Sequence, residues 1–223
     1  MSCGSNEIIS NSIVKTLPRP KAVIFDLGKV LLDFDYGIVI RGIAKRSVIS
    51  LEDLRTLIDQ SPLLYRYETG LMSTLEFYEA IRTATGFEGS LDDFSGIFGD
   101  IFTEIDPMIR LNLNLRLAGI PTFIFSNTNE LAVRHIRSTY PFFKNFNGFI
   151  LSYEHKSMKP AEAIYEAVEQ ATGLQGHALL YIDDRLENVD AGVRRGWQVI
   201  HHLAAHQTIE EVSKRLLIGH VMM

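Results

Sequence analysis

The chain has 223 residues, of which 46% are hydrophobic and 22% are charged, and its formal net charge is −5. This balance is typical of a globular protein, and the length suffices for one large domain or for a core domain with a smaller inserted one. The negative charge and the lack of a basic stretch argue against nucleic acid as a partner.

Residues 1–19 are polar and show no regular hydrophobic period, so we expect a loosely ordered N-terminal arm. They lack the basic and apolar regions of a signal peptide, and no apolar run in the chain reaches the roughly 18 residues of a membrane span. The single cysteine, Cys3, excludes an internal disulfide bond and fits a reducing compartment. The sequence therefore predicts a cytoplasmic protein without a membrane partner.

The first predicted strand is the short apolar run Ala22–Phe25. Residues 36–105 follow it without a convincing strand pattern, and their hydrophobic periodicity predicts helices at Ile38–Val48, Leu51–Asp59, Thr74–Thr85 and Leu91–Thr103. Two of these helices begin with capping-box patterns, Ser50-x-x-Asp53 and Ser73-x-x-Glu76. Because a helical block of roughly 70 residues is far longer than an ordinary crossover, we interpret residues 36–105 as an inserted helical cap domain.

Strands and helices alternate in the rest of the chain. The remaining strands are predicted at Pro121–Phe125, Gly148–Leu151, Ala178–Ile182 and Trp197–Leu203, and the helices at Pro107–Ala118, Glu130–Thr139, Ala161–Thr172 and Glu187–Arg195. This alternation predicts an α/β fold with a parallel sheet that has helices on both faces. The core domain then comprises residues 20–35 and 106–223.

Polar residues follow four of the predicted strands, and in open α/β sheets ligands bind outside the carboxyl ends of the strands. In chain order they are Asp26, Ser126-Asn127, Lys159 and Asp183-Asp184. Each alone has an ordinary explanation as a turn residue, a helix cap or a solvated lysine. Together they suit phosphoryl transfer, because carboxylate-bound Mg²⁺ and a lysine neutralise a phosphate dianion before an anion attacks it.

The segments AVIFDLGKVLLDFD, FIFSNTNE, MKPAEAIYEAV and LLYIDDRLENVDAG resemble the four motifs of the haloacid-dehalogenase-like superfamily of phosphohydrolases. The resemblance covers about residues 20–205, and the helical block lies where that family has its α-helical cap. It implies a Rossmann-like core and a magnesium-dependent phosphatase that hydrolyses a small phosphorylated metabolite through an aspartyl phosphate. The first two motifs and Tyr67-Glu68-Thr69-Gly70 are most similar to bacterial sugar-phosphate phosphatases, which implies a sugar phosphate as substrate.

The resemblance also implies the metal site and the nucleophile. Asp26 corresponds to the nucleophile and to a metal ligand, and Gly28 offers its backbone carbonyl to the metal. Asp184 corresponds to the metal ligand of the fourth motif, with Asp183 beside it as a further candidate. Lys159 is implied to neutralise both Asp26 and the phosphate.

The same resemblance assigns Ser126 and Asn127 to the phosphate and Asn188 to the orientation of water near the metal. Substrate specificity is assigned to the cap, whose polar candidates are Arg41, Tyr67 and Glu68. The first two also have ordinary explanations, a solvated helix residue for Arg41 and partly buried packing for Tyr67.

Gly28 stands where the family pattern has a second aspartate that acts as general acid and base. A glycine cannot protonate a leaving group, so the sequence predicts a steep dependence of rate on leaving-group acidity unless Lys29, or a water held by Asp33 or Asp35, supplies the proton. Two alternatives to a phosphatase stay open. One is a metal-independent 2-haloacid dehalogenase-like hydrolase, and the other is a weakly active phosphate-binding or regulatory protein.

Overall fold

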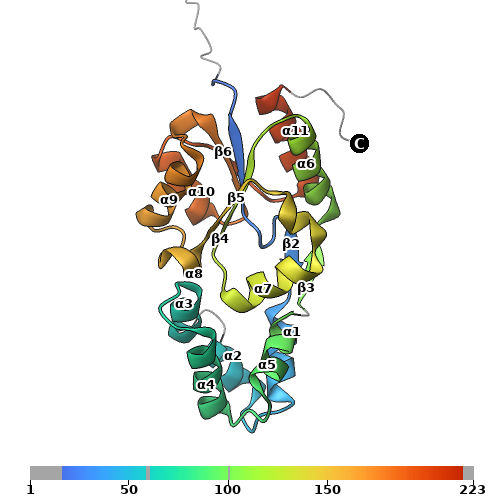
Figure 1. The fold of residues 1–223 in the computed structure, drawn as a ribbon, viewed down its shortest axis with the longest axis vertical. Coiled ribbons are helices and arrows are strands. Elements are labelled where there is room, and N and C mark those ends of the chain that lie inside the picture. The colour runs from blue at the N-terminus through green and yellow to red at the C-terminus, as the bar shows by residue number, and fades with distance from the viewer. Residues whose placement is uncertain (1–16, 59–60, 100, 218–223) are drawn as a thin grey trace, which may run out of the picture.

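The computed structural model describes residues 17–58, 61–99 and 101–217. Most of the expected N-terminal arm and Asp59, the predicted end of a cap helix, lie outside these residues. An α/β core forms one end of the molecule and a helical unit forms the other, with a narrow connection between them (Figure 1).

A five-stranded parallel sheet forms the centre of the core, in the order β5-β4-β1-β6-β7. Its strands are β1 (Ala22–Phe25), β4 (Thr122–Ser126), β5 (Gly148–Leu151), β6 (Leu179–Asp183) and β7 (Gln198–His201). Each lies within one or two residues of its predicted position. The α/β fold with a parallel sheet is therefore confirmed.

Helices cover both faces of this sheet (Figure 1). One face carries α6 (Asp106–Leu117), α7 (Glu130–Thr139) and α11 (Ala205–Leu216), and the other carries α9 (Glu162–Thr172) and α10 (Leu186–Arg194). Successive strand residues point to opposite faces. In β1, Val23 and Phe25 join the first cluster while Ala22 and Ile24 join the second. Burial on both sides explains why these strands are apolar throughout.

The helical unit has its own hydrophobic core. Its helices are α1 (Tyr36–Ala44), α2 (Leu51–Ile58), α3 (Pro62–Glu68), α4 (Thr74–Thr85) and α5 (Leu91–Gly99). Phe77 lies at the centre, stacked on Tyr67 with ring centroids 4.3 Å apart and in edge contact with Phe94 and Phe98. The expected capping box of Ser73 and Glu76 is present at the start of α4. The inserted helical unit predicted from the sequence is confirmed.

A two-stranded antiparallel ribbon, β2 (Leu32–Phe34) and β3 (Phe102–Glu104), connects the unit to the core. The expectation of no strand in 36–105 and of a helix through Thr103 was wrong. Helix α5 ends at Gly99, and the chain then pairs with a segment some 70 residues earlier. A three-residue strand defined by so distant a partner leaves no periodic pattern in the sequence.

Three further helices were not predicted: α3, the four-residue α8 (Ser152–His155) and α11. Helix α3 has clear local signals, because Ser61 caps it through Leu64 N and Pro62 occupies its first position. Short 3₁₀ helices span Pro141–Asn145 and Gly176–Ala178.

The helical unit is docked against the carboxyl edge of the sheet. At the end of α3, Ser152 Oγ donates to the carbonyl of Glu68 at 2.6 Å. A Cβ atom on Gly70 would lie 2.0 Å from the carbonyl oxygen of Tyr153, so only glycine allows this approach. The Tyr67 hydroxyl accepts from Leu131 N, the second residue of α7, at 3.2 Å. These contacts hold the end of α3 directly over the core.

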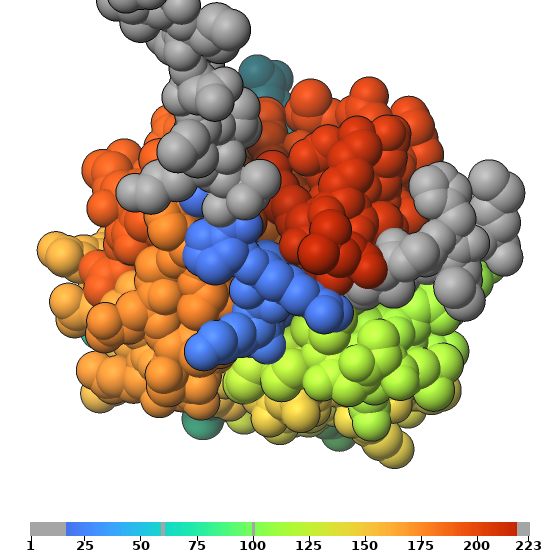
Figure 2. All heavy atoms as spheres, turned by 90° about the horizontal axis from the view of Figure 1, so that it is seen from above, coloured from blue at the N-terminus to red at the C-terminus, as the bar shows by residue number. Residues whose placement is uncertain are grey.

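The amino-terminal end of the described chain lies at the opposite end of the core. Viewed from there, the first residues, in blue, lie between the orange and red segments of the core (Figure 2). Pro18 is held by its carbonyl, which accepts from Gln198 Nε2 at 2.8 Å. Among the described residues, no helix combines the length and the apolar character needed to cross a membrane.

Candidate active site

The site is centred on the residue that follows β1, the middle strand of the sheet. From β1 the chain builds outward through β4 and β5 on one side and later through β6 and β7 on the other. The carboxyl end of β1 is therefore the point where the strand order reverses, and such a point opens a crevice for a ligand. Asp26 occupies it, buried except for 7% of its surface.

Lys159 contacts the carboxyl ends of three neighbouring strands, β1, β4 and β6. Its ammonium lies 3.0 Å from Asp26 Oδ1 and 2.6 Å from Asp183 Oδ2, and it donates to the carbonyl of Phe125 at 3.0 Å. The side chain is 1% exposed. A buried lysine with two carboxylates is a fixed positive charge beside Asp26.

Asp183 is enclosed by donors on both oxygens. Oδ2 accepts from Lys159 and from the Tyr181 hydroxyl, and Oδ1 accepts from Arg185 N at 2.9 Å and Asn188 Nδ2 at 3.0 Å. Four donors satisfy the acceptor capacity of this carboxylate. In this arrangement Asp183 positions Lys159 and leaves the other two aspartates to face the cavity.

The buried charges shift one another's pKa values in opposite directions. Burial, reinforced by Asp183 and Asp184, raises the pKa of Asp26 to about 7, although Lys159 opposes the shift. Burial also acts to raise the pKa of Asp183, but the contact with Lys159 and the hydrogen bonds hold it below its usual value. The excess negative charge of the site therefore rests on Asp26 and Asp184, where a cation would be most stabilising.

The donor set fits a hard divalent cation. Oxygen atoms of Asp26, Asp183 and Asp184 lie within 4.8 Å of one another. The turn after Asp26 uses the carbonyl of Leu27 and the N–H of Lys29 for its hydrogen bonds and not the carbonyl of Gly28. Two carboxylates and one carbonyl suit Mg²⁺, which keeps several waters and needs few protein ligands.

Ser126 and Asn127 lie beside this centre in different roles. Ser126 is 2% exposed, borders the cavity at the end of β4, and donates from its hydroxyl to the carbonyl of Asn127 at 3.3 Å. The Asn127 carboxamide is already engaged, because Nδ2 donates to the carbonyl of Lys159 at 3.0 Å and Oδ1 accepts from Lys159 N at 2.7 Å. The Asn127 side chain therefore fixes the lysine loop, and its carboxamide is not free to bind a ligand.

The space around Gly28 is filled. A Cβ atom at this position would lie 2.7 Å from Cε1 of Phe34. The neighbouring candidates for a proton donor are engaged at the surface, with Lys29 paired to Asp33 and Asp35 paired to Arg41 at 3.1 Å. The structure thus leaves no room for an acidic side chain at position 28 without displacement of the Phe34 ring.

A cavity of about 420 Å³ lies between the core and the helical unit. The polar residues on its core side are Asp26, Lys29, Ser126, Asn127, Thr128, Asn129, Lys159, Asp184, Arg185 and Asn188. The remaining wall is mainly apolar and is formed by Leu27, Leu32, Phe34, Leu64, Phe98, Ile101, Phe102, Ala132, Ile136 and Met158. Ser61, Tyr36, Tyr65 and Glu68 are the polar residues that the cap contributes.

The three cap residues proposed from the sequence lie in different places. Glu68 lines the cavity. Tyr67 is 1% exposed, and its hydroxyl is engaged by Thr74 and Leu131, so it joins cap to core instead of facing a ligand. Arg41 lies at the surface beside Asp35 and does not line the cavity. Burial and partner choice, which determine these roles, are not visible in the local sequence.

Sequence reasoning missed Tyr181 and Arg185. Tyr181 donates to Asp183, and the side chain of Arg185 lines the cavity. For Tyr181 a signal existed: it lies two residues before Asp183 on a strand and so points to the same face. Arg185 had no comparable signal, because it belongs to a turn.

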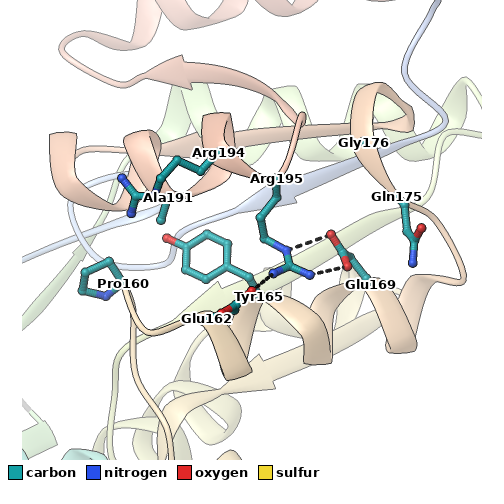
Figure 3. A pocket seen from close by; sticks show the side chains of 9 residues that line it. All are labelled: Pro160, Glu162, Tyr165, Glu169, Gln175, Gly176, Ala191, Arg194 and Arg195. Carbon is teal, nitrogen blue, oxygen red and sulfur yellow. Dashed lines mark hydrogen bonds and ion pairs between the residues drawn. The ribbon is translucent and has the colours of Figure 1, made fainter.

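A larger hollow, of about 730 Å³, lies away from these residues on the side of α9 and α10 (Figure 3). Three of its charged residues, Glu162, Glu169 and Arg195, are paired with one another. Arg195 binds Glu169 at 2.6 Å and Glu162 at 3.3 Å, and Glu169 also accepts from Trp197 Nε1 at 2.9 Å. This hollow contains no carboxylate cluster of the kind found at Asp26, and its ion pairs join α9 to the end of α10.

We expect Glu169→Ala to destabilise the protein, because it leaves the indole N–H of Trp197 without its acceptor and Arg195 with only the longer contact to the exposed Glu162. The cost should be about 2 kcal/mol, which lowers the melting temperature by roughly 4–8 °C. Glu162→Ala is the matched control, since the Glu162 side chain is 79% exposed and should contribute little. Thermal unfolding of both variants by circular dichroism tests this, and equal melting temperatures for the two would contradict the assignment.

These features define a hydrolase with a parallel α/β core and a helical cap. They are the parallel sheet, the carboxylate at its reversal point, the buried lysine and the helical unit over the cavity. The chain belongs to the haloacid dehalogenase-like hydrolases, since the model of that family matches residues 20–196. This confirms the family resemblance of the four motifs.

Known relatives share this architecture. The sesquiterpene phosphatase AstK of Aspergillus oryzae is 26% identical over 202 residues, which cover 89% of this chain and 97% of that protein. The haloacid dehalogenase family enzyme BT-2542 of Bacteroides thetaiotaomicron, solved with magnesium and inorganic phosphate, has a TM-score of 0.73 at 24% identity, covering 81% of this chain and 93% of that one. The L-2-haloacid dehalogenase of Xanthobacter autotrophicus has a TM-score of 0.59 at 19% identity, covering 92% and 84%. The two structures share the fold.

Proposed function

We propose that the protein is a magnesium-dependent phosphatase that hydrolyses a small phosphate monoester through an aspartyl phosphate on Asp26. The observation that supports this proposal most directly is the cluster of Asp26, Asp183 and Asp184 around the buried Lys159. A dehalogenase displaces halide at carbon and has no need of a metal, whereas Asp184, a second carboxylate beside Asp26 at the cavity, supplies a further oxygen ligand for one. AstK, a phosphatase of similar length, supports the same choice.

Asp26 is placed to attack phosphorus. Asp26 borders the cavity, and the ammonium of Lys159, 3.0 Å from Oδ1, holds its charge and orientation. Lys159 is held in turn by Asp183 and by the Asn127 carboxamide at its backbone, so the nucleophile and its counter-charge form one rigid assembly. The Ser126 hydroxyl donates to the carbonyl of Asn127 at 3.3 Å, and we infer that it turns to a phosphate oxygen when substrate binds.

Asp26, Asp184 and the carbonyl of Gly28 would hold the magnesium ion. When bound there, the ion supplies positive charge that offsets the repulsion between the nucleophile and the phosphate dianion. Burial raises the pKa of Asp26 to about 7, and a cation held beside it would favour the ionised form that attacks. Asn188, which donates to Asp183 and lines the cavity, is placed to orient water there.

Two substrate classes are compatible with this function. The sequence resemblance implies a sugar phosphate, whose hydroxyls need several hydrogen-bonding partners. The cavity favours a monoester of an apolar alcohol, because the wall beyond the phosphate site is mainly aliphatic and aromatic. Ser61, one of the few polar groups on that wall, already caps α3. The similarity to a sesquiterpene phosphatase favours the same class.

A comparison of two esters tests both points. Release of inorganic phosphate should require Mg²⁺ and vanish in excess chelator. We expect an isoprenoid monophosphate to be hydrolysed with a kcat/KM at least roughly 10-fold above that of α-glucose-1-phosphate, because an apolar chain gains by burial in an apolar pocket. A higher kcat/KM for α-glucose-1-phosphate would instead favour a sugar phosphate as the substrate. Chloride release from a 2-haloacid in chelator, without phosphatase activity, would establish a dehalogenase instead.

A further inference from the structure

Hydrolysis of an alkyl phosphate needs a proton donor for the departing oxygen. The family pattern places that donor two residues after the nucleophile, and this chain has Gly28 there. The Phe34 ring, 2.7 Å from the position of a Cβ atom, occupies the space where an acidic side chain would extend. A different group that borders the cavity can supply the proton instead.

Glu68 is the carboxyl group that the cap places in the wall of the cavity. It is the last residue of α3, and the backbone at this point is fixed to the core by Ser152 Oγ, which donates to its carbonyl at 2.6 Å. Its Oε1 accepts from the Tyr36 hydroxyl at 3.3 Å. Glu68 and Asp26 border the same 420 Å³ space from opposite sides, cap and core.

We propose that Glu68 is the catalytic acid and base of this enzyme, supplied by the cap in place of the missing core aspartate. This inference rests on the proposed phosphatase function. It differs from an assignment of Glu68 to substrate specificity, because it predicts an effect that depends on the acidity of the leaving alcohol.

The reaction has two steps, and Glu68 gives up one proton in the first and takes one back in the second. In the first, Asp26 Oδ bonds to phosphorus, the ester P–O bond breaks, and its electron pair on the alcohol oxygen takes the proton from Glu68. In the second, water attacks the aspartyl phosphate, the bond from phosphorus to Asp26 breaks, and the Glu68 carboxylate takes a proton from that water. The products are the alcohol and inorganic phosphate, and both carboxyl groups return to their starting forms.

The electrostatics of the cavity support this role. Burial raises the pKa of Glu68 to about 7, opposed by the hydrogen bond from Tyr36 and by the charge of Arg185. A donor with this pKa is protonated in about half of the molecules at neutral pH, which is the condition that favours proton transfer in both directions. Ser152 of α8 binds the backbone and adds no charge. The other charged residues around the cavity are Asp26, Lys29, Lys159 and Asp184.

The test is Glu68→Gln, assayed with Mg²⁺ on an alkyl monophosphate and on p-nitrophenyl phosphate, an aryl ester whose leaving group, p-nitrophenolate, departs without a proton. We expect kcat/KM to fall by roughly 10²-fold or more for the alkyl ester and by less than about threefold for the aryl ester. Glu79→Gln is the control, because Glu79 lies on α4, pairs with Arg82 and does not line the cavity. Melting temperatures show whether each variant is folded.

The wild-type enzyme gives a second readout that needs no variant. Because the protonated form of Glu68 is the donor, kcat/KM for the alkyl ester should fall as pH rises above about 7. The ratio of alkyl to aryl rates removes titrations common to both substrates, such as that of Asp26. A ratio that stays constant with pH would overturn the proposal.

The remaining outcomes separate this proposal from the function on which it rests. Equal losses on both esters in Glu68→Gln, or wild-type hydrolysis of the aryl ester alone, would overturn the role of Glu68 and leave the phosphatase intact. If the wild-type protein releases no phosphate from either ester in Mg²⁺, the proposed function fails, and the role of Glu68 fails with it.

Discussion

Asp26→Asn should abolish turnover and leave the fold intact. An amide in place of the carboxylate is nearly isosteric but is not a nucleophile toward phosphorus, so we expect kcat to fall by more than roughly 10³-fold. Asp190→Asn provides a matched control, since Asp190 is an exposed residue of α10. Phosphate release and the melting temperature are measured for both. Residual activity above about a tenth of the wild-type rate would contradict the assignment of Asp26.

The stability of Asp26→Asn follows from the same pKa shift. Burial raises the pKa of Asp26 to about 7 in the folded protein, so its ionised form is disfavoured there relative to the unfolded chain. Below its ordinary pKa the carboxyl is neutral in both states and the penalty is absent; above about pH 7 the full penalty applies. A neutral asparagine avoids it, and the variant should therefore unfold at a temperature no lower than the wild-type protein at pH 8.

Asp183→Ala and Asp184→Ala should fail in different ways although the two residues are adjacent. Asp183 is fully buried and accepts from Lys159, Tyr181, Arg185 N and Asn188. Its removal leaves a buried lysine with one carboxylate partner and several donors unsatisfied, at a cost of about 3–5 kcal/mol. We expect the melting temperature of Asp183→Ala to fall by roughly 10 °C.

Asp184 is half-buried, and burial together with Asp183 raises the pKa of its carboxyl. Its charge is therefore disfavoured in the absence of a cation, and Asp184→Ala should keep close to the wild-type melting temperature. The Mg²⁺ concentration for half-maximal activity should instead rise by roughly 10-fold or more. Loss of a residue that only supports a metal ligand already weakens metal binding by about this factor, and loss of a direct ligand should weaken it at least as much. A large loss of stability in Asp184→Ala, or an unchanged Mg²⁺ requirement, would contradict this division of roles.

The core of the fold was predictable because its signals are local. Each strand of the sheet is a short run that is buried on both faces, and each long helix repeats its apolar residues along one side. Helix α7 and strand β1 were predicted to the residue. The connection between core and cap was not, because Leu32–Phe34 and Phe102–Glu104 become strands only by pairing with each other.

In the candidate site, too, the local features were predictable from the sequence and the contacts between distant segments were not. Asp26, Ser126, Lys159 and Asp184 could be expected to lie together because each comes after a strand predicted from the sequence, and parallel strands bring their carboxyl ends to one edge. The engagement of Asn127 with the lysine loop and the enclosure of Asp183 depend on contacts between distant segments. The contrast between Tyr67 and Glu68 shows the limit most clearly. The two are neighbours on α3, yet one joins the cap to the core and the other borders the cavity.

The central claim is that Asp26 is phosphorylated during turnover. The most direct measurement is rapid acid quenching of the enzyme with a hydrolysed ester and Mg²⁺, followed by mass spectrometry of the intact protein and its peptides. We predict the added mass of one phosphoryl group on the peptide that contains Asp26, formed within the first turnover and absent in Asp26→Asn. Phosphate release without any phosphorylated protein, or a phosphoryl group on a different residue, would contradict the account.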